Sequence, residues 1–125
     1  MTDRMEHYKR GLALFSEQKP EEAVEEYRKA LELSPDWTEC MHALAMAISN
    51  LGRQEEAIAI GKRIVELDPD DPFAHTSLSM FYMRNNQIPE AEAEGAKARM
   101  VSWKQELKTN PDAPPPDDGP IRVVQ

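Results

Sequence analysis

The sequence predicts an all-α fold, a solenoid of three helix–turn–helix repeats with six helices. One reason is a period of 34 residues, because Leu-Ser-Pro-Asp at 33–36 returns as Leu-Asp-Pro-Asp at 67–70. Three alanines share this period, Ala23, Ala57 and Ala91. The other reason is that apolar residues recur every three or four positions, which is helical spacing. A short helix pair cannot bury its apolar stripe alone, so successive pairs must stack.

The first repeat, residues 4–37, begins with a helix whose apolar stripe is Met5, Tyr8, Leu12 and Phe15. Lys19-Pro20 ends this helix, and proline suits the start of the next one, where its missing N–H would be unpaired. The second helix carries a new stripe before Ser34-Pro35 stops it, Ala23, Val24, Tyr27, Ala30 and Leu31.

The second repeat, residues 38–71, is broken between its helices by Asn50-Leu51-Gly52, and the third, residues 72–105, by Asn85-Asn86. The last helix differs because Trp103 stands where the closing proline is expected. We therefore predict one helix of about 20 residues, from Ile88 to about Lys108. Its extra length offers apolar side chains that could fold back or meet a partner, Met100, Val101, Trp103 and Leu107.

The repeats resemble the tetratricopeptide repeat (TPR). The small residue midway along the first helix is Gly11, Ala45 and Ser79 in the three units, and the next bulky residue is Leu14, Ile48 and Tyr82. The closing proline is Pro35 and Pro69. His7, Met41 and His75 depart from the family, which usually has tryptophan there, and Gly61 and Gly95 replace the aromatic Tyr27. The resemblance implies a right-handed α-solenoid over residues 1–109.

Composition excludes several function classes. The chain has 125 residues and a net charge of −8, which disfavours nucleic acid and anionic membranes as partners. Its single cysteine, Cys40, cannot form an intrachain disulfide or a multi-thiolate metal site. No signal-like or membrane-spanning apolar run is present, so we expect a soluble, cytoplasmic protein.

The last segment, residues 110–125, contains five prolines and is expected to be extended or disordered. Its final residues could instead form a short motif that adds a strand to a partner's sheet, through Ile121, Val123 and Val124. A frayed terminus is the simpler interpretation.

No catalytic motif, cofactor site or metal site is recognisable, so we expect no enzyme activity and no cofactor. The histidines His7, His42 and His75 lie on successive first helices and are interpreted as packing residues. The glutamates of the second helices are interpreted as a solvated face, Glu21, Glu22, Glu25, Glu26, Glu55, Glu56, Glu90, Glu92 and Glu94.

The first helices carry a second apolar face, with no partner expected within the chain. In TPR proteins these positions line a concave peptide-binding surface, and here several are methionine, which suits varied partners. Part of this face could instead be ordinary core. The predicted groove consists of Met5, Tyr8, Leu12, Phe15, His42, Met46, Phe73, Thr76, Met80, Met83 and Arg84.

The family's clamp for a C-terminal carboxylate is not matched, because its basic and amide positions hold Tyr8, Leu12, Ala43, Phe73 and Ser77. Only Arg84 could hold an acidic group. The sequence therefore predicts a non-catalytic module that binds an apolar or amphipathic protein segment, as an adaptor, assembly factor or small subunit of a complex. The alternative is self-assembly, in which the tail or last helix of a neighbouring copy fills the groove.

Overall fold

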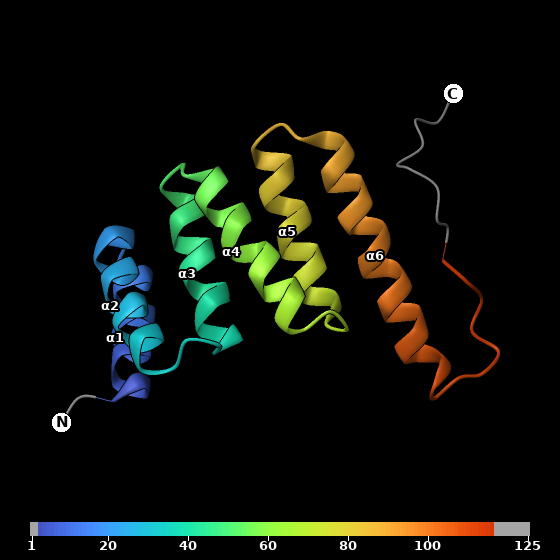
Figure 1. Cartoon of the computed structure of the whole chain (residues 1–125), viewed down its shortest axis with the longest axis horizontal. Helices are drawn as coiled ribbons and strands as arrows, with labels where there is room; N and C mark the ends of the chain where they lie inside the picture. The colour runs from blue at the N-terminus through green and yellow to red at the C-terminus, as the bar shows by residue number, and fades with distance from the viewer. Residues whose placement is uncertain (1–2, 117–125) are drawn as a thin grey trace.

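The computed structural model describes residues 3–116 and contains six α-helices there (Figure 1). They form three consecutive pairs, as the 34-residue period predicts. The pairs are α1 with α2, α3 with α4, and α5 with α6, and the bounds are α1 Arg4–Ser16, α2 Pro20–Leu33, α3 Thr38–Asn50, α4 Gln54–Leu67, α5 Pro72–Arg84 and α6 Ile88–Leu107.

The helix ends follow from short-range chemistry. The Asp3 carboxylate accepts a hydrogen bond from the Glu6 N–H at 2.9 Å, and Asp71 does the same for the Phe73 N–H at 3.0 Å. These caps satisfy backbone donors that have no partner within a helix. Each tight turn within a repeat uses one left-handed residue, again spaced by 34, namely Gln18, Gly52 and Asn86 with φ of 65°, 85° and 60°.

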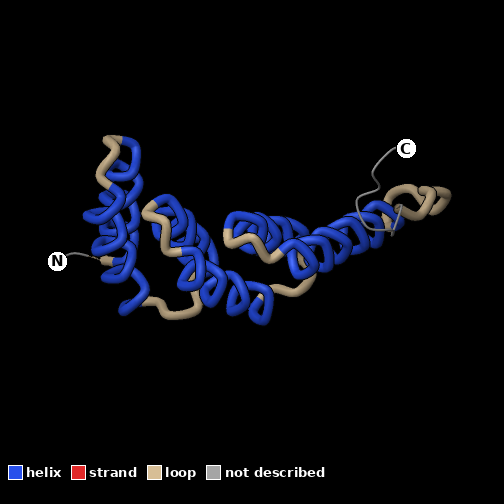
Figure 2. The backbone as a smooth tube through the Cα atoms, turned by 90° about the horizontal axis from the view of Figure 1, so that it is seen from above, coloured by secondary structure: helices blue, strands red, loops and turns tan. Residues whose placement is uncertain are grey.

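The helices contact their chain neighbours in order, so the pairs follow one another along a curve (Figure 2). The first helices of the pairs also touch one another, α1 with α3 and α3 with α5. Within the described residues, α2, α4 and α6 make no such contacts with each other. The first helices are therefore closer together, and their shared face is the inner, concave side of the curve.

The core is built from small and medium-sized side chains, with Tyr27 and Phe81 as the largest fully buried ones. The Tyr27 ring lies directly over Gly11, where a Cβ atom would overlap it. Gly61 likewise allows the close approach of Leu78 on α5, 3.0 Å from an added Cβ. Gly95 has ordinary space around it, so close approach explains the glycine at 61 but not at 95.

The third repeat ends in the longest helix, α6, with 20 residues against 14 in both α2 and α4. This confirms the predicted extended last helix. Beyond it, residues 108–116 turn back along α6 instead of continuing away from it (Figure 1). The predicted motif residues Ile121, Val123 and Val124 lie outside the described residues.

Candidate functional site

Most of the large apolar side chains that are exposed in the described chain lie at positions predicted to line the groove. Six such residues are exposed, and four of them are at predicted groove positions: Met5, Leu12, Phe73 and Met83, with 41, 44, 60 and 44% of their surface accessible. Exposure of apolar surface in a soluble protein indicates a contact site when it is concentrated on one face. These four residues, which we call the exposed groove set, lie on α1 and α5.

Four other predicted groove residues are partly buried and pack against the hydrophobic core, namely Tyr8, Phe15, Met46 and Met80. Tyr8 is the clearest case, with its ring 4.8 Å from Trp37 and 6.1 Å from Tyr27. Arg4 covers the other side of this cluster, 4.8 Å from the Trp37 ring. Tyr8 therefore has partners within the chain, although none was expected for this face. Its contact with Trp37 joins α1 to the segment before α3.

The middle of the groove is formed by His42 on α3, which contacts Phe73 on α5 with ring centroids 4.8 Å apart. Neither ring nitrogen of His42 has a hydrogen-bond partner among the described residues. Burial lowers the pKa of His42, and Asp71 and Asp68 offset only part of this effect. At neutral pH the side chain is therefore an uncharged ring that holds Phe73 in place.

Arg84 is held at one end of the inner face by a short polar network. Its guanidinium donates to the Ser49 hydroxyl at 2.7 Å, and that hydroxyl donates to the Gln54 side-chain oxygen at 2.7 Å. Gln54 in turn donates to the Ser49 carbonyl at 2.9 Å. Because Arg84 itself is exposed while Ser49 is buried, the network presents a fixed positive charge beside Met83.

The interpretation of all second-helix glutamates as a solvated face is wrong for Glu26 and Glu94. Glu94 is 8% exposed and lies 2.9 Å from Nδ1 of His75, while Glu26 lies 3.4 Å from Nδ1 of His7. His75 also donates from Nε2 to the Pro69 carbonyl at 2.8 Å. His7 and His75 are buried, as interpreted, but each is paired with a carboxylate across its repeat.

These pairs could have been found in the sequence, because both partners recur together. His7 and His75 differ by 68 residues, twice the period, and so do Glu26 and Glu94. In the middle repeat the same two positions are Met41 and Ile60, which pack in an apolar cluster. Buried His–Glu pairs are thus a property of the outer repeats, where each pair joins the two helices of its repeat.

The other chemically reactive groups lie in settings that suit packing. Cys40 is fully buried, and burial raises its pKa to about 11. Between residues 3 and 116, no three His, Cys, Asp or Glu side chains cluster closely enough to hold a metal ion. No helix in that part of the chain has the length and apolar character needed to cross a membrane.

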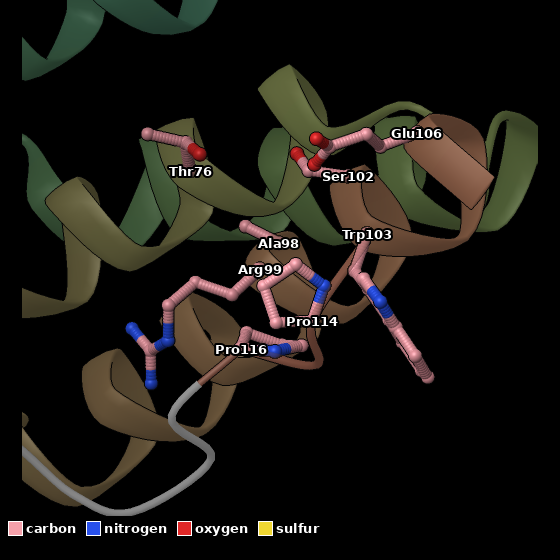
Figure 3. Close-up of a pocket in the computed structure, with 8 residues that line it drawn as sticks. All are labelled: Thr76, Ala98, Arg99, Ser102, Trp103, Glu106, Pro114 and Pro116. Carbon is pink, nitrogen blue, oxygen red and sulfur yellow. The ribbon is translucent and has the colours of Figure 1, made fainter. Parts of the chain in front are cut away.

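A cleft of about 360 Å³ lies at the open edge of the third repeat (Figure 3). The sequence did not indicate it, since it depends on how the chain turns after α6. Thr76 on α5 contributes one wall, and the returning segment contributes another through Pro114 and Pro116. The remaining lining comes from α6, with Ala98, Arg99, Ser102, Trp103 and Glu106.

Comparison with known proteins agrees with this architecture. Two TPR family models, each described as a tetratricopeptide repeat, match residues 5–37 and 38–71. Photosystem I assembly protein Ycf3 of Synechococcus sp. (strain CC9605) is 26% identical over 114 residues, covering 84% of this chain and 66% of that protein.

Solved structures show the same fold. The crystal structure of MamA has a TM-score of 0.79 and 20% identity, over 84% of this chain and 61% of that one. The second TPR of Spaghetti (RPAP3), solved with the HSP90 peptide SRMEEVD, has a TM-score of 0.73 and 20% identity. The match covers 80% of this chain and 93% of that one. The chain spans less than two thirds of Ycf3 and of MamA. Taken with the three stacked helix pairs, the two matching models, which together cover more than half of its residues, show that this chain belongs to the tetratricopeptide repeat family.

Proposed function

We propose that this chain is a non-catalytic binding module that holds an apolar or amphipathic segment of a partner protein on its inner face. The observation that carries the proposal is the exposed groove set, because four of the six large exposed apolar side chains in residues 3–116 are at predicted groove positions, two on α1 and two on α5. Each apolar anchor of a partner that is fully buried against them contributes about 1.5–3 kcal/mol before ordering costs.

The charges around the groove define the partner further. Arg84 is fixed beside Met83 by Ser49, so an acidic residue next to an apolar anchor fits this end of the face. At the other end, Met5 and Leu12 offer an apolar surface two helical turns long. An amphipathic helix or an extended peptide with spaced apolar residues satisfies both ends.

An assembly role is the biological setting that we favour within this proposal. The 26% identical relative is named as an assembly protein. An adaptor or assembly factor needs affinity for a segment, and the inner face supplies the apolar contacts for that.

The test uses peptides selected from a random library on the native chain. Phe73→Glu/Met83→Glu changes two exposed residues, so folding is retained, and we expect selected peptides to lose at least tenfold in affinity. Ala59→Glu, at an exposed position of α4, is the matched control and should bind as the native chain does. Equal binding by the Phe73→Glu/Met83→Glu variant would contradict the proposed function.

A further inference from the structure

The segment after α6 is fastened back onto that helix. The Asn110 N–H donates to the Glu106 carbonyl at 2.8 Å, and the Ala113 N–H donates to the Asn110 carbonyl at 3.0 Å, which together turn the chain. The Trp103 indole then donates to the Ala113 carbonyl at 3.0 Å, and Ala113 is only 6% exposed. The direction of the chain at Pro114 is therefore set by contacts with α6.

This direction brings the described chain to the edge of the inner face. Pro116, the last described residue, lines the same cleft as Thr76, which is a groove residue on α5 (Figure 3). Met80 and Met83 follow Thr76 along the same face of α5, at steps of four and three residues. The chain beyond Pro116 thus starts beside the third repeat's part of the groove.

The chain that follows is long enough to cover that part. Nine residues, 117–125, extend at most about 30 Å. Met83 is seven residues beyond Thr76 on α5, which is about 10 Å along the helix. Residues 117–120 are sufficient as a linker, and the apolar residues Ile121, Val123 and Val124 come at the right distance.

The chemistry of the two surfaces is complementary. Ile121, Val123 and Val124 are apolar, and Met83 is an exposed apolar side chain with 44% of its surface accessible. Arg122 separates Ile121 from Val123 in the sequence, so the match lies in the three apolar side chains alone. Burial of these side chains against Met83 removes apolar surface from water on both sides.

We propose that Ile121, Val123 and Val124 bind in cis to the part of the inner face formed by Thr76, Met80 and Met83, and so compete with the partner segment. This inference rests on the proposed function, because it takes the inner face to be the binding surface. A short linker gives an effective concentration in the millimolar range. A weak apolar contact is then enough to cover the groove for much of the time and to weaken partner binding by about two- to tenfold.

The experiment places a spin label at residue 125 in the full chain, through Gln125→Cys. Cys40 is fully buried with its pKa raised to about 11, so it does not react, and the native chain serves to check this. We expect the NMR signals of Thr76, Met80 and Met83 to lose most of their intensity, while those of Met5 and Leu12 on α1 keep theirs. The matched control is the same labelled chain with Ile121→Asp/Val124→Asp, in which the losses should disappear.

Two further measurements separate the alternatives. Labelled chain mixed with isotope-enriched, unlabelled chain should show no losses; losses in the mixture would mean that a second copy fills the groove, and would overturn binding in cis. Unchanged signals at Thr76, Met80 and Met83 in the labelled chain would also overturn it.

Selected peptides should bind the Ile121→Asp/Val124→Asp chain about two- to tenfold more tightly than the native chain. If they bind it equally but still lose affinity for Phe73→Glu/Met83→Glu, the tail proposal fails while the proposed function stands.

Discussion

In the first repeat a glycine on α1 faces a large side chain on α2, whereas in the third repeat a glycine on α6 faces a small side chain on α5. The Tyr27 ring covers Gly11, but Gly95 faces Ser79, whose hydroxyl lies 3.7 Å from an added Cβ. The two repeats therefore pack differently around their glycines. The two repeats agree in their His–Glu pairs and differ from the middle repeat, where Met41 and Ile60 are apolar. The two outer repeats therefore share the polar pair that joins their helices, but not the packing around the glycine.

The largest effect is expected where the buried pair is broken in the third repeat. Glu94→Ala leaves His75 without its carboxylate, and we expect the free energy of unfolding to fall by about 3 kcal/mol. Glu26→Ala should cost less, because the His7–Glu26 distance is 3.4 Å rather than 2.9 Å. Urea denaturation followed by circular dichroism measures both.

A double variant sharpens this comparison with the middle repeat. His75→Met/Glu94→Ile places in the third repeat the residue types that Met41 and Ile60 have in the second. This variant should be at least as stable as the native chain, since well-packed apolar residues can replace a buried polar pair. If the double variant is as unstable as Glu94→Ala, the two kinds of pair are not interchangeable.

The next effect tests the glycine of the first repeat. In Gly11→Ala the new methyl group overlaps the Tyr27 ring, which must move within a packed core. Overpacking of this kind exceeds the gain in helix propensity, and we expect a net loss of about 1–2 kcal/mol. A thermal melt no lower than that of the native chain would contradict the packing described for Tyr27.

The matched change in the third repeat should have the opposite sign. Gly95→Ala meets only ordinary contacts, at 3.6 Å from Arg99 and 3.7 Å from Ser79. Alanine also favours the helix more than glycine does, so the variant should be more stable by about 0.5–1 kcal/mol. A loss of stability comparable to that of Gly11→Ala would mean that the two repeats pack alike after all.

The smallest effect concerns pH and the first repeat. Burial raises the pKa of Glu26, but hydrogen bonds and charges from Lys29 and His7 outweigh it, so the pKa lies below its ordinary value. A lowered pKa stabilises the fold above the ordinary value, and this contribution is lost as the pH falls through the folded-state pKa. We therefore compare stability between about pH 6 and about pH 3, a range that brackets the ordinary pKa of a glutamate. The free energy of unfolding should fall less steeply in Glu26→Gln than in the native chain.

The sequence predicted most of the fold because the fold is periodic. Pro20 and Gly52 mark helix boundaries through their own backbone chemistry, so the helices could be placed without any tertiary contact. The His75–Glu94 pair was missed because its partners are 19 residues apart on different helices, and helical periodicity describes one helix at a time.

The candidate site was less accessible to sequence reasoning. Apolar spacing does not distinguish Tyr8, which packs against Trp37, from Leu12, which is 44% exposed. That difference depends on which side chains reach over from the next repeat. The return of the chain to Thr76 depends on two backbone hydrogen bonds and one from the Trp103 indole, and no local pattern predicts this combination.

The order of helix contacts along the chain also determines how this molecule gains and loses its structure. Each helix packs mainly against the helix before it and the helix after it. Contacts between sequence neighbours close only short loops, which favours fast folding. Terminal helices have one neighbour and inner helices have two, so α1 and α6 should open before α3 and α4, and amide protons of the middle pair should exchange most slowly. The ends of this chain are therefore its most readily opened parts, and the returning segment at 108–116 secures one of them.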